Sequence, residues 1–472
     1  HFKLMLKLQF KYLSFFFGII SILSFFNIIY SYYLNLYLNL DTYYYSLITS
    51  FIVSIIFYKT KQIEKKFLIF DKILTVFLGY LLIPIVLSIP FYFSIYNLTF
   101  LDSYFEAISG FTSTGFTIFE NIKNIDQSLI IWRSSTQWIG GLYFLFSIIF
   151  LIDIYDENFK KTLTNFISFD SSEVLKQALK IFLLYSAMTL VIFIILNFFS
   201  IRSFNSLNLA FTLISSGGFL PVNDLTNIIK TNAQTIVLSI LMLTSFFSIF
   251  FIYNLIFINK KNVNFFYEDL HLIIYYLVIV AIFFLFFSFN SDFSLNLLSI
   301  SSSISNIGFS IDTNQKNLSF IYLILVIIGG SFFSTSSGLR FIKIYSLFKY
   351  SLNQILSFSR PKNIFMNKLI FTKINFDFNE INKYFLTLLI FILSLIILTS
   401  LLSISGIEFE NSFKLSILTL MNTVNSSIYG LEEFDFNNIH FLTKYCLILF
   451  MIIGRIELLT ILLLLKKFLF KS

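Results

Sequence analysis

The sequence predicts an all-α polytopic membrane protein with about ten transmembrane helices. Of its 472 residues, 57% are hydrophobic and only 12% are charged, whereas a soluble domain carries roughly a quarter charged residues. Apolar stretches of about 20 residues or more recur along the whole chain, and as helices they can cross a hydrocarbon core of ~30 Å. A short amphipathic segment followed by a turn of small residues also recurs four times, which indicates an internal repeat.

Hydropathy along the chain gives the predicted spans in order. They cover residues 12–38, 42–58, 67–97, 128–155, 174–200, 231–258, 268–289, 318–345, 383–405 and 441–468. The first two lie before the repeating part and form an N-terminal helix pair. An even number of spans places both termini on the same side of the membrane.

The distribution of lysine and arginine indicates which side this is. Most of the 33 basic residues fall in segments that share a side with the termini. The opposite side holds only Lys123, Arg133, Arg202, Lys230, Lys316, Lys414 and Lys444. The positive-inside rule therefore places both termini in the cytoplasm. The net charge of +8 is a topology signal, so it predicts a lipid membrane and not nucleic acid as the partner.

Residue types that carry catalysis are sparse. Cys446 is the single cysteine, which excludes an intrachain disulfide framework and a cysteine-based metal cluster. The three histidines are too scattered in the sequence for a metal site. Asp102, Glu106 and Asp126 are spread along one outer connection without the spacing of a catalytic cluster. We therefore predict that the chain is not an enzyme.

Four outward connections share one pattern. Each begins with a short helix-compatible stretch and then turns at small and polar residues, between two spans. The four connections are 98–127, 201–230, 290–317 and 406–440, with short helices expected over 101–110, 203–213, 293–303 and 410–420. A short helix followed by irregular backbone predicts a re-entrant pore loop, because such backbone survives at membrane depth only beside protein or a water-filled path.

The turns of these loops align with one another. They are residues 112–116 (TSTGF), 215–219 (SSGGF), 305–309 (SNIGF) and 422–426 (NTVNS), which places Gly115, Gly218, Gly308 and Asn425 at one position. Glycine, and next to it asparagine, tolerates the left-handed backbone that lets successive carbonyls point one way. A ring of such carbonyls can replace the hydration shell of an ion. The predicted ion-binding filter is Thr114, Gly115, Gly217, Gly218, Ile307, Gly308, Val424 and Asn425.

The charge of the ion follows from helix polarity. Each short helix would point its partially negative C-terminal end at the centre of the ring, which favours a cation. The segments near the turns supply no ring of basic residues, which an anion site would need. The predicted architecture is therefore four membrane–pore-loop–membrane repeats around one pore. The N-terminal pair covers 1–66, and the repeats cover 67–160, 161–260, 261–382 (with a cytoplasmic linker) and 383–472.

Several motifs resemble one known family. Residues 105–117 (FEAISGFTSTGFT), 132–141 (WRSSTQWIGG), 329–340 (GGSFFSTSSGLR) and 454–460 (GRIELLT) are similar to motifs of the TrkH/KtrB/HKT superfamily of cation transporters. The additional N-terminal pair resembles its TrkH branch. The resemblance implies potassium uptake across the plasma membrane of a prokaryote (the inner membrane of a bacterium). It also implies a homodimer with one pore per subunit and a cytoplasmic nucleotide-binding regulatory subunit of the TrkA/KtrA type, since this chain has no nucleotide fingerprint.

The resemblance also implies a gate. The segment 329–340 matches the intramembrane gating loop of the family, and its small residues are poor at holding a regular helix. The expected gating residues are Ser334, Thr335, Ser336, Ser337, Gly338, Arg340 and Arg455. A patch for close helix packing is the alternative for the loop. The resemblance implies that Arg455 faces the pore below the filter, and a charge within a span is costly and usually functional or paired. Glu457 is expected to meet another helix.

Three departures from the family pattern affect ion choice and gating. Asn425 replaces the last glycine, the loop reads Ser336-Ser337-Gly338 without a glycine pair, and Arg340 stands where lysine is usual. A sodium-permeable or weakly selective cation transporter of the same fold therefore remains an alternative to a potassium channel. A secondary transporter of an organic solute is a more distant one, because it predicts inverted repeats whereas these repeats share one orientation.

Overall fold

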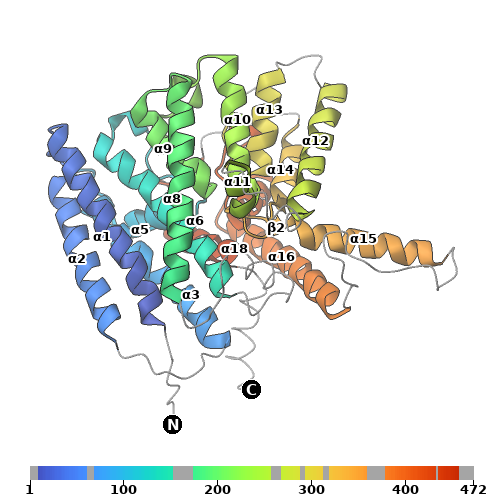
Figure 1. Ribbon diagram of the computed structural model, residues 1–472, viewed down its shortest axis with the longest axis horizontal. Coiled ribbons are helices and arrows are strands. Elements are labelled where there is room, and N and C mark those ends of the chain that lie inside the picture. Colours follow the sequence, from blue (N-terminus) through green and yellow to red (C-terminus); the bar gives the residue numbers. More distant parts are fainter. Residues whose placement is uncertain are drawn as a thin grey trace, which may run out of the picture.

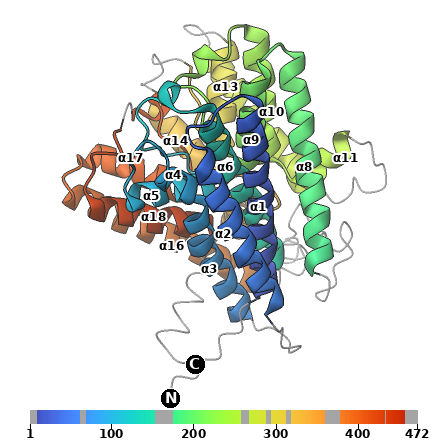
Figure 2. The ribbon, with the colours of Figure 1, turned by 90° about the vertical axis from the view of Figure 1, so that its left-hand side faces the viewer.

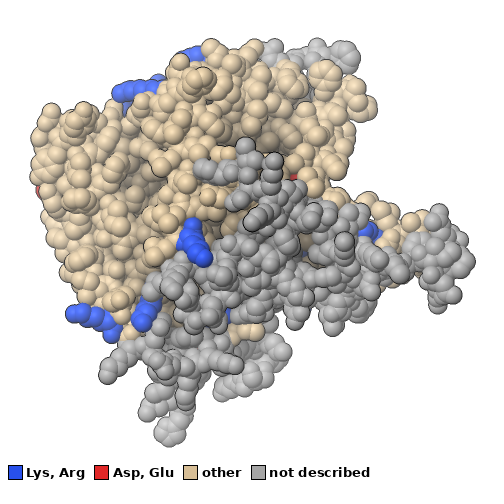
Figure 3. Space-filling view, viewed as in Figure 1, with Lys and Arg blue, Asp and Glu red and all other residues tan. Residues whose placement is uncertain are grey.

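The computed structural model describes residues 9–60, 69–151, 174–256, 267–287, 293–311, 318–358, 378–431 and 434–456. These residues are almost entirely helical, and the strands among them are the two-residue pair β1 (Ile328–Gly329) and β2 (Leu339–Arg340), which run parallel. Within the described ranges, six helices are long and apolar enough to cross a membrane. On the face of the molecule that Figure 3 shows, few of the described side chains are charged. The predicted fold class is confirmed.

The N-terminal pair consists of α1 (Phe10–Tyr33) and α2 (Leu40–Lys59), which pack against each other along their length (Figure 1). The hydroxyl groups of Ser24 and Ser46 are 3.0 Å apart between the two helices. The Tyr43 hydroxyl donates to Ser128 Oγ at 2.9 Å and so ties the pair to the first repeat. Figure 2 shows α1 and α2 beside α3, on one face of the molecule.

The first two repeats each contain a span, a short helix and a second span. The first comprises α3 (Ile69–Leu87), α4 (Ile89–Tyr92), α5 (Phe100–Phe111), η1 (Ile122–Asn124) and α6 (Gln127–Phe150). The second comprises α8 (Val174–Phe198), α9 (Ser203–Ser215), η3 (Leu225–Asn227), α10 (Asn232–Phe246) and α11 (Ile249–Ile256). Local sequence explains several ends: the Thr99 side chain caps α5, and Thr231 with Gln234 forms a capping box at α10.

The third and fourth repeats follow the same plan. The third comprises α12 (Tyr267–Phe287), α13 (Phe293–Ile304), α14 (Ser319–Ile327), the two strands and α15 (Phe341–Ser357). The fourth comprises α16 (Phe378–Ile404), α17 (Phe409–Leu420), η8 (Ser427–Tyr429) and α18 (Phe441–Arg455). The four short helices α5, α9, α13 and α17 agree with the predicted segments to within two residues at each end.

The repeats are arranged in a closed circle. Each short helix packs against the second span of the preceding repeat: α9 against α6, α13 against α10, and α17 against α14. The contact between α18 and α5 joins the last repeat to the first. This cyclic pattern gives the order of the repeats around the centre. The core lies along α6, whose side chains are buried at nearly every position.

Three predicted spans are interrupted. The span 67–97 breaks at Ser88, between Pro84 and Pro90, because proline removes a helix hydrogen-bond donor. The span 231–258 breaks after Phe246, where α11 begins on the other side of Phe247 and Ser248. Each of these two predicted spans thus consists of two consecutive helical segments, and Ile69–Tyr92 together is long and apolar enough to cross a membrane.

The span 318–345 is the most strongly interrupted. Its helix α14 ends at Ile327, and the small-residue loop 328–340 follows before α15 projects from the side of the molecule (Figure 1). Serine and threonine side chains in the loop bond to backbone groups instead of continuing the helix. The predicted domain boundaries at 66, 160 and 260 lie outside the described residues, so the division into repeats at those positions stays a prediction.

Candidate functional site

The four short helices end in the same backbone conformation. In each repeat, one residue after the helix adopts a left-handed conformation, and these residues are Ser113 (φ 58°), Ser216 (φ 58°), Asn306 (φ 59°) and Asn422 (φ 47°). The next residue donates its backbone N–H to the carbonyl five positions earlier. The four bonds run from Thr114 to Ser109 (2.9 Å), Gly217 to Thr212 (2.8 Å), Ile307 to Ser302 (3.0 Å) and Thr423 to Leu418 (2.9 Å). The four turns are thus structural copies of one another.

This equivalence corrects the alignment of the fourth repeat by one residue. Two positions after the left-handed residue lie Gly115, Gly218, Gly308 and Val424, which we call the ring residues. The sequence alignment placed Asn425 there because it matched one asparagine with three glycines. The helix α17 ends one residue earlier relative to that alignment, so Asn422 takes the left-handed position and Val424 the ring position.

Backbone angles explain why a valine is accommodated in the ring. Gly115 (φ +85°) and Gly308 (φ +84°) lie in the left-handed region, which disfavours a side chain. Gly218 and Val424 have negative φ, which a β-branched residue adopts without strain. Alternate repeats therefore differ in their need for glycine.

Side-chain hydrogen bonds join the turns of neighbouring repeats. Ser216 Oγ donates to the Ser305 carbonyl, which links the second repeat to the third. Asn306 Nδ2 donates to Thr423 Oγ1 at 3.3 Å and links the third to the fourth. Asn422 Nδ2 donates to Thr114 Oγ1 at 3.0 Å and links the fourth to the first. The left-handed residues of three repeats thus connect the turns into a ring.

The first and second repeats meet through backbone. A Cβ on Gly115 would lie only 2.7 Å from Gly218 Cα, so the two glycine backbones are in close contact. The amide of Gln137 is oriented so that its oxygen and its nitrogen both have hydrogen-bond partners. In this orientation its oxygen accepts from the backbone N–H groups of Gly218 and Phe219, both at 3.0 Å. Gln137 thereby holds these amides on the side away from the ring.

A buried ion pair braces the outer side of the first turn. Arg133 Nε donates to Glu106 Oε1 at 2.8 Å, and the two side chains are 1% and 0% exposed. Glu106 Oε2 accepts from the backbone N–H of Ile118 at 3.0 Å, and Arg133 Nη2 donates to Thr117 Oγ1 at 3.0 Å. Sequence reasoning treated Glu106 and Arg133 as outer-loop charges. The signal that could have found the pair is the position of Arg133 inside the predicted span 128–155.

A second ion pair joins the first and last repeats. Lys444 Nζ lies 2.5 Å from Asp102 Oδ1, and the side chains are 6% and 12% exposed. Lys444 also donates to the Asn437 carbonyl at 3.0 Å. Since Asp102 belongs to α5 and Lys444 to α18, this pair strengthens the closing contact of the circle.

Arg455 lies on the other side of the ring, at the end of α18, and is 2% exposed. Its guanidinium donates to Ser337 Oγ, to Ser113 Oγ at 3.3 Å and to the Ser215 carbonyl at 3.5 Å. It also lies 4.0 Å from the centre of the Phe144 ring. Among the described residues no carboxylate pairs with Arg455, and Glu457 lies outside them.

The loop 328–340 is bonded to the second repeat. Ser336 donates its backbone N–H to the Ser245 carbonyl at 2.9 Å, and Thr335 Oγ1 donates to the Ile214 carbonyl at 2.7 Å. Arg340 Nη1 donates to the carbonyls of Ser331 and Ser336 at 3.0 and 3.2 Å, and so holds the loop in its folded path.

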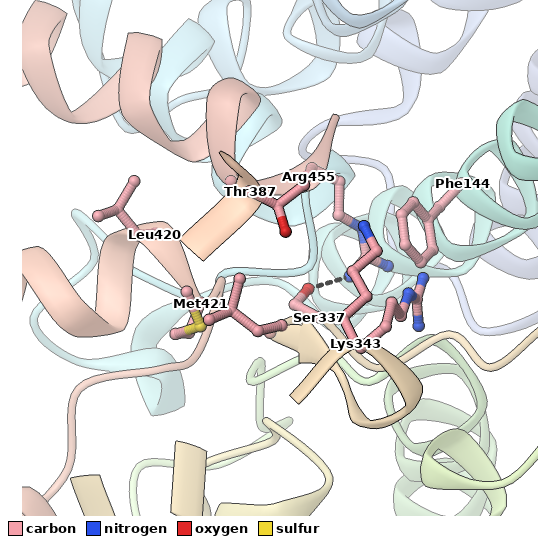
Figure 4. A pocket seen from close by; sticks show the side chains of 11 residues that line it. Phe144, Ser337, Lys343, Thr387, Leu420, Met421 and Arg455 are labelled. Carbon is pink, nitrogen blue, oxygen red and sulfur yellow. Dashed lines mark hydrogen bonds between the residues drawn. The ribbon is translucent and has the colours of Figure 1, made fainter. Parts of the chain in front are cut away.

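A small cavity lies beside the contact between the loop and Arg455. Its volume is about 40 Å³, and Figure 4 shows Arg455, Lys343 and Ser337 around it, with Phe144 beside Arg455. Of the expected gating residues, Ser337, Gly338, Arg340 and Arg455 line this cavity. Ser334, Thr335 and Ser336 instead bond to Arg340, to the second repeat or to each other.

Comparison with known proteins shows which proteins the chain is similar to. No protein-family model matches it. It is 22% identical over 399 residues to the Trk system potassium uptake protein TrkH of Salmonella typhimurium, covering 80% of this chain and 81% of the relative. The crystal structure of the potassium transporter TrkH from Vibrio parahaemolyticus superposes with a TM-score of 0.80 at 18% identity, covering 97% and 98% of the two chains. These similarities confirm the resemblance to the TrkH/KtrB superfamily that the sequence motifs indicated.

Two other relatives carry the names of a cation transporter and a potassium uptake protein. An uncharacterized cation transporter of Methanocaldococcus jannaschii is 24% identical over 431 residues, covering 84% of this chain and 82% of the relative. The Trk system potassium uptake protein TrkG of Escherichia coli is 20% identical over 458 residues, covering 90% and 92%. These similarities agree with the prediction that the chain is not an enzyme.

Proposed function

We propose that this chain is the membrane subunit of a potassium uptake system, which passes a dehydrated K⁺ ion through a ring of backbone carbonyls. The observation that carries the proposal is the meeting of four structurally equivalent turns in one closed ring. The names of the TrkH and TrkG relatives, which are potassium uptake proteins, support the choice of ion.

The proposed filter is formed by the ring residues and the residue before each. These are Thr114, Gly115, Gly217, Gly218, Ile307, Gly308, Thr423 and Val424. Four helices end at the ring, and their C-terminal ends carry partial negative charge that stabilises a cation there. The backbone N–H groups of Gly218 and Phe219 donate hydrogen bonds to the Gln137 side-chain oxygen, which supports this role because the carbonyl oxygens stay available for the ion.

The loop 328–340 and Arg455 form the proposed gate. Arg455 supplies a positive charge directly beneath the ring, so it raises the energy of a cation leaving the filter toward the cytoplasm. Its bond to Ser337 couples this charge to the loop. A displacement of the loop would therefore also move the charge, which supports a single gate built from both parts.

Partners are proposed from the family and from one exposed helix. We expect a homodimer in the plasma membrane of a prokaryote, with both termini cytoplasmic and a nucleotide-binding regulatory subunit of the TrkA/KtrA type. Helix α15 projects from the side of the molecule and exposes Phe348 and Ile355 (63% and 64%), which supports it as a docking element (Figure 1). The Trk-system names of the relatives agree with a system of several subunits.

The test is ion flux into liposomes that hold the purified chain. We expect K⁺ and Rb⁺ to enter and Na⁺ to be excluded, and Arg455→Ala to raise the K⁺ flux about tenfold, as a lowering of the barrier by roughly 1.4 kcal/mol would. Arg202→Ala, which removes an exposed outer arginine, is the matched control and should leave the flux unchanged.

Two outcomes would change the conclusion. Equal Na⁺ and K⁺ flux would make the chain a weakly selective cation transporter of the same fold. The absence of any cation flux from folded Arg455→Ala protein would contradict the proposed function, because this variant removes the proposed barrier.

A further inference from the structure

We propose that Val424 bridges the ring and sets the width of the ion path, so that the fourth repeat selects ions by size as well as by its carbonyl oxygen. This inference rests on the proposed function. At the ring position the fourth repeat carries a valine side chain, whereas the other three repeats carry glycine.

The valine side chain contacts two of the three ring glycines. A Cβ built on Gly218 would lie 2.4 Å from Val424 Cβ, and a Cβ built on Gly308 would lie 2.7 Å from Val424 Cγ1. Both separations are far shorter than a van der Waals contact, so the valine occupies the space directly in front of these glycines. The Val424 carbonyl oxygen also lies 2.8 Å from the Cβ position of Gly308.

The order of the repeats shows that the contact with Gly218 crosses the ring. Packing of each short helix on the preceding repeat gives the cyclic order one, two, three, four. The hydrogen bonds from Ser216, Asn306 and Asn422 follow the same order. The second and fourth repeats therefore face each other, and the side chain of Val424 lies between them.

The position of the valine is held by its neighbours. Asn422 is bonded to Thr114 Oγ1 and to the Met451 carbonyl, and Thr423 Oγ1 accepts from Asn306, so the backbone before Val424 is fixed. A β-branched side chain also has few rotamers to adopt. The Cβ of Val424 stays between the second and fourth repeats whichever rotamer the methyl groups adopt, so the narrowing acts on every ion that passes.

Ion size provides the test, because a narrow ring penalises a large cation more than a small one. We compare Cs⁺ and K⁺ flux in liposomes for the wild type, Val424→Gly and Asn425→Gly. The ratio of the two fluxes is the readout, since it is independent of the amount of folded protein and of how often the gate opens. We expect Val424→Gly to raise the Cs⁺/K⁺ ratio about tenfold, while Asn425→Gly, one residue away, leaves it unchanged.

The results that would contradict the role of Val424 differ from those that would contradict the proposed function. A Cs⁺/K⁺ ratio in Val424→Gly equal to that of the wild type, with K⁺ flux intact, would overturn the role of Val424 and leave the proposed function standing. Equal rises in both glycine variants would also overturn it, because a general loosening of the turn would then be the cause. If neither the wild type nor Arg455→Ala passes any cation, the proposed function fails first.

A second variant covers the case in which Val424→Gly does not fold. Val424→Ala keeps the Cβ and removes both methyl groups, so its Cs⁺/K⁺ ratio should lie between those of the wild type and the glycine variant. A wild-type ratio in folded Val424→Ala protein would count against the inference in the same way.

Discussion

Arg133 and Arg455 are both almost fully buried, yet their surroundings differ. Each lies against an aromatic ring, Arg133 at 4.2 Å from the centre of Phe219 and Arg455 at 4.0 Å from that of Phe144. Arg133, on the outer side of the ring, is paired with the Glu106 carboxylate. Arg455, on the opposite side, bonds only to hydroxyl and carbonyl oxygens among the described residues.

The difference separates a neutralised structural charge from the charge that we propose acts in gating. A buried charge is expensive unless it is paired, and pairing also cancels its field at a distance. The Glu106–Arg133 pair therefore braces the first turn without repelling a cation. Arg455 keeps most of its field, and it lies beneath the ring where a cation would have to pass.

The largest effect is expected for Glu106→Gln, which keeps the size of the side chain but removes its charge. Arg133 would remain buried without a counter-charge, and breaking such a pair typically costs about 3–5 kcal/mol of stability. Thermal unfolding in detergent, compared with the wild type, measures the loss. An unchanged melting temperature would mean that Thr117 and Phe219 satisfy Arg133 without the carboxylate.

A smaller effect on stability is expected for Arg455→Met, which replaces the guanidinium by an apolar chain. Because no carboxylate among the described residues loses a partner, we expect a free energy of unfolding within about 1 kcal/mol of the wild type, together with raised K⁺ flux. The same unfolding assay gives the comparison. A loss as large as that of Glu106→Gln would show that Arg455 is as structural as Arg133.

The smallest effect is expected for Glu410→Gln. Glu410 pairs with Lys414 at 2.6 Å on the surface of α17, but its side chain is 76% exposed. Solvent screens such a pair, so melting temperature and K⁺ flux should both equal those of the wild type. A measurable loss of stability would indicate that this outer surface is covered in the functional assembly.

Much of the fold follows from local sequence, and the four short helices are the clearest case. Their apolar patterning and polar ends are local properties, so the bounds expected from sequence agree closely with α5, α9, α13 and α17. The loop at 334–338 was also expected, since small residues compete with helical hydrogen bonding. The roles of the filter and gate residues stay predictions for the flux measurements.

The pairing of buried charges could not be predicted from local sequence. Glu106 and Arg133 are distant in sequence, and nothing in either segment alone specifies the other as its partner. The prediction of the residue at the fourth ring position was wrong for a related reason. Asparagine and valine are both acceptable by local propensity, and only the left-handed backbone of Asn422 and the bond from the Thr423 N–H to the Leu418 carbonyl show which residue lies in the ring.

The sequence by itself determined the membrane class, the repeat and its short helices, because hydrophobicity and periodicity act within one segment. Only the tertiary structure decided that Val424 faces Gly218, that Glu106 neutralises Arg133, and that Arg455 bonds to Ser113 and Ser337. These relations join segments from different repeats. They depend on how four imperfect copies pack in a circle, and that packing is a property of the whole chain.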